Sequence, residues 1–309
     1  MGVLEKSEWE KPIDSAAVGN IVQKMLSEYP FFKSFNIGKS ILGKEIPVLI
    51  LGEGRRKYLY VGAHHGMEWI TSSLLLRMTD DFCELYRSGG RVGKLSIRWL
   101  WEQIQLHIVP MLNPDGVDYE IHGVSSENPL YERVLKMNGG SADFRHWQAN
   151  ARGVDLNHNY NAGFAEYKRL EKVNGIACGA PTRYSGETPE SEPETSALCN
   201  YIRFHSPFCA IFSFHTQGEE LFWKSHGKVV PGSESAIRKL ALTSGYLLNE
   251  AEGLASFGGL TDWCIESCAT PAVTFECGKG QNPLPISDLF SIYTKLRAAL
   301  FSAPIYFKK

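Results

Sequence analysis

The chain has 309 residues, of which 43% are hydrophobic and 21% charged, so it falls in the range of ordinary globular proteins and can bury a sizeable core. A formal net charge of −2 gives no electrostatic reason to expect a nucleic acid or an anionic membrane as a partner. No stretch approaches the roughly 18 uninterrupted apolar residues of a membrane span. We therefore expect a single α/β domain over residues 1–309 and a small or peptidic substrate.

The cysteines and the N-terminal residues bear on the compartment. Seven cysteines, an odd number without a Cys-x-x-Cys motif, predict neither a disulfide framework nor a cysteine-rich zinc site. The N-terminal residues contain no apolar core flanked by basic residues, so a secretion signal is not expected. These features predict reduced thiols and a cytoplasmic protein.

The first third of the chain shows clear periodic patterns. Apolar residues recur at helical spacing over 13–29, and segments 35–41 and 46–51 flank a Leu-Gly-Lys turn, which predicts an antiparallel hairpin. The apolar run 59–61 then predicts a buried parallel strand. An apolar stripe at i+4 spacing indicates a helix over about 69–86.

Two side chains between that strand and that helix have the character of metal ligands. His65 and Glu68 follow the strand at His-x-x-Glu spacing, which lets an imidazole and a first-turn carboxylate reach one ion. Alone, the pair is also explained by a loop histidine and a helix-dipole carboxylate. His64 is not expected to bind the metal, because its side chain leaves the strand on the opposite side from His65.

The middle of the chain is less regular. Segment 105–112 predicts a strand closed by a turn at 113–116, and the regular pattern weakens from 117 to 186. Residues 143–164 are rich in Asn, Arg, His and aromatic side chains, a composition that suits either a pocket lining or a solvated loop. Thr188 and Pro189 predict the start of a helix that ends near His205.

Two more strands near the C-terminus end in polar groups. The apolar run 208–214 leads to His215, and the run 272–275 leads to Glu276. Helices are expected over 233–250, near 261–267 and over 287–300. Three apolar strands thus end in His65, His215 and Glu276, and the carboxyl ends of such strands face the crevice where α/β proteins bind ligands.

This arrangement indicates a catalytic zinc site. His65, Glu68 and His215 supply three ligands and leave a fourth position open, as catalytic zinc sites do. Zinc would polarise a carbonyl and acidify water, and a carboxylate is then needed to move the proton to the leaving nitrogen. Glu276 is the candidate base, with an ion pair to Lys279 as its structural alternative.

Several phrases occur in the order found in zinc metallocarboxypeptidases of the carboxypeptidase A type, which the chain resembles over about residues 57–279. The phrases are Gly-Ala-His-His-Gly-Met-Glu-Trp (62–69), Asn-Pro-Asp-Gly (113–116), Gly-Val-Asp-Leu-Asn-His-Asn-Tyr (153–160), Phe-His-Thr-Gln-Gly (214–218), Gly-Gly-Leu-Thr-Asp-Trp (258–263) and Thr-Phe-Glu-Cys-Gly-Lys-Gly (274–280). The resemblance implies an α/β fold with a mixed, mostly parallel-core, eight-stranded sheet between helices. It also implies one Zn²⁺ per chain on His65, Glu68 and His215, with Glu276 as catalytic base. Within the family, the chain looks most like bacterial γ-D-glutamyl-meso-diaminopimelate peptidases.

Departures from the digestive carboxypeptidases concern the substrate pocket. Their Asn-Arg clamp for a terminal carboxylate reads Asn157-His158 here, and one imidazole cannot replace a bidentate guanidinium. The arginine that polarises their scissile carbonyl is replaced by Gln148, so that role passes to Gln148, Arg145 or Arg152. Their mobile tyrosine is absent from segment 254–257. We expect Asn157, His158 and Arg152 to bind substrate.

The combined hypothesis is a cytoplasmic zinc peptidase that cleaves the γ-D-glutamyl–meso-diaminopimelate (or other diamino acid) amide of murein tri- or tetrapeptides. Gln217, Glu219 and Glu220 are candidate acceptors for the far end of the diamino acid, unless they form only a solvated strand edge. The alternatives are a carboxypeptidase, a de-glutamylase or an N-acyl amino acid deacylase on the same scaffold. A zinc-holding protein without catalysis is a further alternative, which the presence of Glu276 disfavours.

Overall fold

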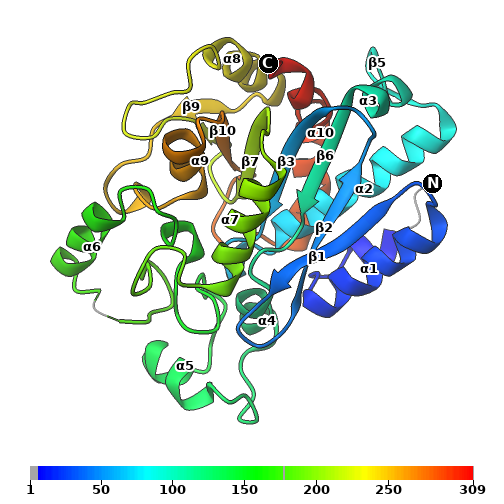
Figure 1. The fold of residues 1–309 in the computed structure, drawn as a ribbon. Helices are drawn as coiled ribbons and strands as arrows, with labels where there is room; N and C mark the ends of the chain where they lie inside the picture. The colour runs from blue at the N-terminus through cyan, green and yellow to red at the C-terminus, as the bar shows by residue number, and fades with distance from the viewer. Residues whose placement is uncertain (1–5, 177, 309) are drawn as a thin grey trace.

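The computed structural model describes residues 6–176 and 178–308. A mixed eight-stranded sheet runs through it, with helices on both faces (Figure 1), as predicted. The strand order is β1-β2-β6-β3-β7-β10-β8-β9. The strands are β1 (Lys33–Lys39), β2 (Glu45–Leu51), β3 (Arg56–Gly62), β6 (Ile104–Val109), β7 (Ala210–His215), β8 (Glu220–Phe222), β9 (Leu247–Asn249) and β10 (Ala272–Glu276), with β4 (Arg91–Val92) and β5 (Leu95–Ser96) in a separate ladder.

The centre of the sheet is parallel and its flanks are mixed. Strands β6, β3, β7 and β10 run parallel to one another, whereas β1, β2 and β6 alternate in direction and β8 is antiparallel to β10. The carboxyl ends of the parallel strands therefore meet at one edge. In the register, Glu276 of β10 lies opposite His215 of β7, and Phe214 lies opposite Gly62 of β3.

Helices cover both faces of the sheet. They are α1 (Ser15–Glu28), α2 (Ile70–Ser88), α3 (Ile97–Gln103), α4 (Pro114–His122), α5 (Tyr131–Met137), α6 (Phe164–Val173), α7 (Pro193–His205), α8 (Glu234–Ser244), α9 (Leu260–Cys268) and α10 (Leu289–Tyr306), with short 3-10 helices η1 (Lys6–Trp9), η2 (Gly66–Glu68), η3 (Leu156–His158), η4 (Gly253–Ala255) and η5 (Ile286–Asp288). One core packs α1, α2, α3, α8 and α10 on the sheet, and the other packs α7 and α9 on the opposite face. No helix within the described residues is long and apolar enough to cross a membrane.

Strand β3 shows why the central strands read as continuous apolar runs. Tyr58 and Tyr60 enter the first core, while Leu59 and Val61 enter the second, because side chains alternate between the faces of a sheet. Each such burial stabilises the fold by about 1.5–3 kcal/mol. The Tyr60 hydroxyl donates to the Leu300 carbonyl at 2.7 Å, so its polar group is not left unpaired.

The segment after β6 corrects one prediction. The expected turn at 113–116 is the first turn of α4, in which the Asn113 side chain accepts from Gly116 N–H at 2.9 Å and Pro114 occupies the first position. Asn and Pro favour helix starts as well as turns, so the sequence pattern alone did not distinguish them. Helices α5 and α6 and most of α4 lie within the region where the pattern weakens.

Two predicted helix limits are also wrong. Helix α7 begins at Pro193 rather than near Pro189, because the Asn159 side chain donates to the carbonyls of Ser185 and Thr188 and holds that segment as a loop. Helix α8 ends at Ser244 rather than near residue 250. Gly245 takes a left-handed conformation (φ 69°) and closes the helix, and β9 follows and pairs with β8.

Candidate metal centre and active site

The loop after β3 presents two of the expected ligands. His65 lies three residues beyond the end of β3, and Glu68 closes the short helix η2 that follows. Gly66 N–H donates to the Gln148 carbonyl at 3.0 Å, which fixes this turn against a neighbouring loop. A Cβ at Gly66 would lie 2.3 Å from the Gly116 carbonyl oxygen, so only glycine fits there.

His215, the last residue of β7, completes a group of three polar side chains. His65 Nδ1 lies 3.0 Å from Glu68 Oε1, His215 Nδ1 lies 2.9 Å from Glu68 Oε2, and the two Nδ1 atoms are 3.3 Å apart. The ligands of a tetrahedral zinc ion with bonds of about 2.0–2.1 Å are separated by about 3.3 Å. The three side chains therefore fit a zinc ion, and they form a group capable of holding a metal.

The group is buried except at His65. The side chains of Glu68 and His215 are 3% and 2% exposed, whereas that of His65 is 12% exposed. Burial alone would raise the pKa of Glu68, but the charges of His65 and His215 outweigh it and lower that pKa to about 2. Glu68 is thus held as a carboxylate, the form in which it binds a metal.

Each of the two candidate histidine ligands has a polar partner on its outer nitrogen. His65 Nε2 donates to Asp155 Oδ1 at 3.0 Å, because a carboxylate oxygen only accepts. This bond leaves the lone pair of His65 Nδ1 directed at the centre of the group. His215 Nε2 lies 3.0 Å from Ser213 Oγ, which offers an acceptor for the corresponding N–H. Such outer contacts fix the tautomer and the ring orientation of a metal ligand.

His64 contacts the ring of His215 and is not one of the three residues of the metal group. Its ring stacks on that of His215 with centroids 5.2 Å apart. Its Nδ1 is 3.4 Å from Ser213 Oγ, and its Nε2 is 2.9 Å from the Tyr160 hydroxyl. Burial lowers the pKa of His64 well below its ordinary value, so the ring is neutral and serves as a hydrogen-bonding support.

Glu276 ends β10 at the same edge of the sheet, opposite His215 in register. Burial, followed by the nearby charge of Glu68, raises the pKa of Glu276 well above its ordinary value. The sequence left open an ion pair between Glu276 and Lys279. In the structure, Lys279 instead contacts Glu219 at 3.1 Å. The charges that act on Glu276 are therefore those of the metal group and of Glu220 rather than that of Lys279.

A cavity of about 90 Å³ opens beside Glu276, and Asn157 is among its lining residues. Asn157 Oδ1 accepts from Leu260 N–H at 3.2 Å, which leaves the Nδ2 donor of the amide available. His158, in contrast, stacks on Tyr167 with centroids 4.0 Å apart, and its Nδ1 donates to the Phe257 carbonyl at 2.8 Å.

Arg145, Gln148 and Arg152 were considered for polarising the scissile carbonyl of the substrate. Each of these side chains has a hydrogen-bond or ion-pair partner within the protein. Arg152 forms a forked contact with Glu192, with its Nε and Nη2 each 3.1 Å from a carboxylate oxygen. Arg145 is 73% exposed and pairs with Asp143. The Gln148 side-chain oxygen accepts from the Thr182 hydroxyl, so its amide nitrogen is the group still available.

Sequence reasoning missed the outer contacts of the metal group and one wall of the cavity. Ser213 was detectable, since it lies two residues before His215 and therefore on the same face of the strand. Asp155 precedes Asn157 by two residues, but nothing in the sequence indicated that its carboxylate contacts His65. Phe222 and Lys224 form the missed wall of the cavity. The pairing of β8 with β10 places Phe222 there, and no sequence pattern predicted that pairing.

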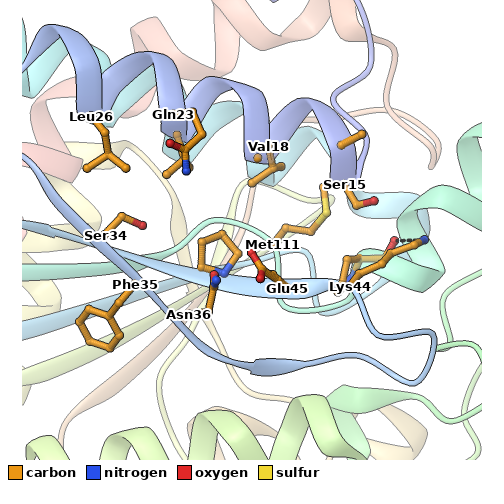
Figure 2. Close-up of a pocket in the computed structure, with 15 residues that line it drawn as sticks. Ser15, Val18, Gln23, Leu26, Ser34, Phe35, Asn36, Lys44, Glu45 and Met111 are labelled. Carbon is orange, nitrogen blue, oxygen red and sulfur yellow. Dashed lines mark hydrogen bonds between the residues drawn. The ribbon is translucent and has the colours of Figure 1, made fainter.

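A second cavity, of about 350 Å³, lies between α1 and the β1–β2 hairpin (Figure 2). Val18 and Leu26 of α1 face Ser34 and neighbouring β1 residues across it. Lys44 at its end is already paired with Asp118 at 2.7 Å. None of the metal-group residues lines this cavity, so side-chain chemistry rather than size marks the functional site.

Comparison with known proteins agrees with the geometry. Residues 19–292 match the zinc carboxypeptidase family, peptidase M14. The chain is 32% identical over 293 residues to gamma-D-glutamyl-L-diamino acid endopeptidase 1 of Lysinibacillus sphaericus, a match that covers 95% of this chain and 72% of that protein. The chain is therefore a hydrolase with a metallocarboxypeptidase-like fold. It belongs to the zinc carboxypeptidase family, whose members are zinc-dependent.

Solved structures show the same fold. Thrombin activatable fibrinolysis inhibitor is similar with a TM-score of 0.75 and 19% identity, covering 99% of this chain and 77% of that one. Murein-tripeptide amidase MpaA from Escherichia coli O157 is similar with a TM-score of 0.54 and 22% identity, covering 87% and 91%. These similarities confirm the predicted eight-stranded architecture.

Proposed function

We propose that the chain is a zinc-dependent peptidase that hydrolyses the amide between γ-D-glutamate and a diamino acid, meso-diaminopimelate above all, in murein peptides. One zinc ion per chain is held by His65, Glu68 and His215, and Glu276 is the catalytic base. The observation that carries the substrate assignment is the 32% identity to a gamma-D-glutamyl-L-diamino acid endopeptidase over 95% of the chain. The contacts in the site support the chemistry.

The proposed division of roles follows from the positions of the side chains. A zinc ion supplies Lewis acidity, which polarises the scissile carbonyl and acidifies water. The Glu276 carboxylate takes a proton from the attacking water and delivers it to the leaving nitrogen. Because β7 and β10 are parallel neighbours, this base and the ligand His215 share one edge of the sheet.

On the substrate side, the amide of Asn157 is assigned to the carboxylate of the diamino acid beside the scissile bond. His158 is less suited to that carboxylate: burial lowers its pKa, and its Nδ1–H is used by Phe257, so Nε2 presents a lone pair. Such a nitrogen accepts from an N–H group and repels a carboxylate. Arg152 is assigned to Glu192, and it supports the loop rather than the substrate.

The compartment is part of the same proposal. All seven cysteines are free thiols in the structure, and five of them are buried. Free thiols are usual where glutathione and thioredoxin keep cysteines reduced. The free thiols support the proposal that the enzyme hydrolyses murein peptides in the cytoplasm.

The test is hydrolysis of matched substrates by the purified, zinc-loaded protein. We expect release of diaminopimelate from L-Ala-γ-D-Glu-meso-diaminopimelate, loss of activity with a chelator and recovery with zinc. Peptides ending in Phe or Leu should be cleaved far more slowly, since a site built for polar groups rejects analogues without them. Equal or faster cleavage of the Phe or Leu peptides would contradict the proposal and indicate a plain carboxypeptidase. A preference for N-acyl amino acids would indicate a deacylase.

A further inference from the structure

The cavity beside Glu276 extends along the face shared by β8 and β10. In the register of these strands, Glu276 lies opposite Glu220 and Thr274 lies opposite Phe222. Strand β8 ends at Phe222, and Lys224 follows it by two residues in the loop beyond the strand. Phe222, Lys224, Thr274 and Glu276 all line the cavity.

The charges along this cavity are unevenly placed. Glu276 marks the catalytic end, and Lys224 is the cation among the described lining residues. Asp262, the remaining charged residue of the lining, accepts from Gly259 N–H at 3.3 Å and caps α9. Lys224 in turn forms an ion pair with Glu250, and the two side chains are 26% and 48% exposed. Lys224 thus lines the cavity, and its partner Glu250 directly precedes the lining residue Ala251, with both charged side chains within reach of solvent.

We propose that Lys224 and Glu250 form the subsite for the far end of the leaving diamino acid, a claim that rests on the proposed function. Lys224 binds the distal carboxylate and Glu250 binds the distal ammonium group. The pair is complementary to the two opposite charges at the end of diaminopimelate. It makes the enzyme selective for diaminopimelate over lysine, whose side chain carries only the ammonium group.

The three acceptors expected from the sequence have other partners. Gln217 Oε1 accepts from Gly280 N–H at 3.3 Å. Glu219 contacts Lys279 at 3.1 Å and Lys295 at 2.6 Å. Glu220 accepts from the Asn249 side chain at 3.2 Å. Glu250 meets a cation at the cavity instead, so the acceptor for the distal ammonium group is assigned to it.

The experiment compares kcat/KM for L-Ala-γ-D-Glu-meso-diaminopimelate and L-Ala-γ-D-Glu-L-Lys with the zinc-loaded full chain. We expect the wild type to prefer diaminopimelate by at least about tenfold, as a site built around a polar contact does. Lys224→Glu should reverse the preference, because it repels the distal carboxylate and attracts the lysine ammonium group. Lys224→Met should abolish the preference without reversing it.

The matched control is Lys228→Glu. Lys228 follows four residues later, is 70% exposed and contacts Glu266 at 3.4 Å, so this variant makes the same charge change away from the cavity. Its preference should equal that of the wild type. A wild-type preference retained in Lys224→Glu, or a reversal in Lys228→Glu as well, would overturn the subsite.

A failure of the proposed function is distinguishable from a failure of the subsite. If the wild type cleaves neither peptide, the proposed function fails, and calorimetry with free meso-diaminopimelate and free lysine then tests the subsite directly. Tighter binding of diaminopimelate to the wild type, lost in Lys224→Glu, supports the subsite. Equal binding of both amino acids to both proteins overturns it.

Discussion

The metal-facing and substrate-facing sides of this site are built differently. On the metal side, His65 and His215 each have a buried polar partner, Asp155 and Ser213, behind the atom that faces the centre. On the substrate side, Lys224 and Glu250 are partly exposed and pair with each other, and Lys224 Nζ also lies 4.9 Å from the centroid of the Trp223 ring. The first arrangement fixes geometry before any ligand arrives, whereas the second can exchange its partner for a substrate. In the proposed function, the strand ends supply the chemistry, and the loops that follow the short strands β8 and β9 supply the contacts that select the substrate.

The largest effect should come from removing the base on the metal side. Glu276→Gln keeps the shape of the side chain but removes the proton acceptor, so kcat should fall roughly 10²-fold to 10⁴-fold, the usual contribution of a positioned general base. Steady-state kinetics and metal analysis on the same sample check this. Zinc content should stay at one per chain, and a variant with near-normal turnover would remove Glu276 from its role.

A smaller effect should follow from removing the support behind His215. His64→Phe keeps an aromatic ring but removes the contacts with Ser213 and Tyr160, so zinc affinity should fall about 10-fold to 100-fold. Competition with a chromophoric chelator measures this affinity. His107→Phe is the control, because His107 is equally buried but bonds to the Tyr201 hydroxyl away from the metal group. Unchanged zinc affinity in His64→Phe would contradict the supporting role.

The smallest effect on catalysis should come from Arg152, which the sequence suggested as a substrate contact. Because its guanidinium forks onto the buried carboxylate of Glu192, Arg152→Gln should lower the free energy of unfolding by about 1–3 kcal/mol and leave KM within about twofold. Urea unfolding and kinetics measure the two quantities. Arg203→Gln, which breaks the more exposed pair with Glu190, should cost about 0–1 kcal/mol. A large rise in KM at an unchanged free energy of unfolding would show that Arg152 contacts the substrate after all.

The metal side was largely predictable from the sequence, for a physical reason. A buried parallel strand is a continuous apolar run, so the polar residue that ends it, such as His215 or Glu276, stands out. The parallel arrangement then brings those ends together, which the register confirms. The roles of Glu68 and Glu276 in binding and catalysis stay predictions.

The substrate side could not be predicted in the same way. Strand β8 is only three residues long and too short to show alternation, and Lys224 lies in the loop two residues beyond it, so no sequence pattern predicted that Lys224 lines the cavity. His158 was expected to hold a carboxylate from its place beside Asn157. Its contact with the carbonyl of Phe257, distant in sequence, determines instead which ring nitrogen carries the proton.

An anomalous difference map at the zinc absorption edge, from crystals of the zinc-loaded protein, tests the metal side most directly. We expect one strong peak per chain, about 2.0–2.1 Å from His65 Nδ1 and His215 Nδ1 and about 2.0–2.2 Å from a Glu68 carboxylate oxygen, with Glu276 facing it. A peak bound by other residues, or no peak near these three side chains, would contradict the account.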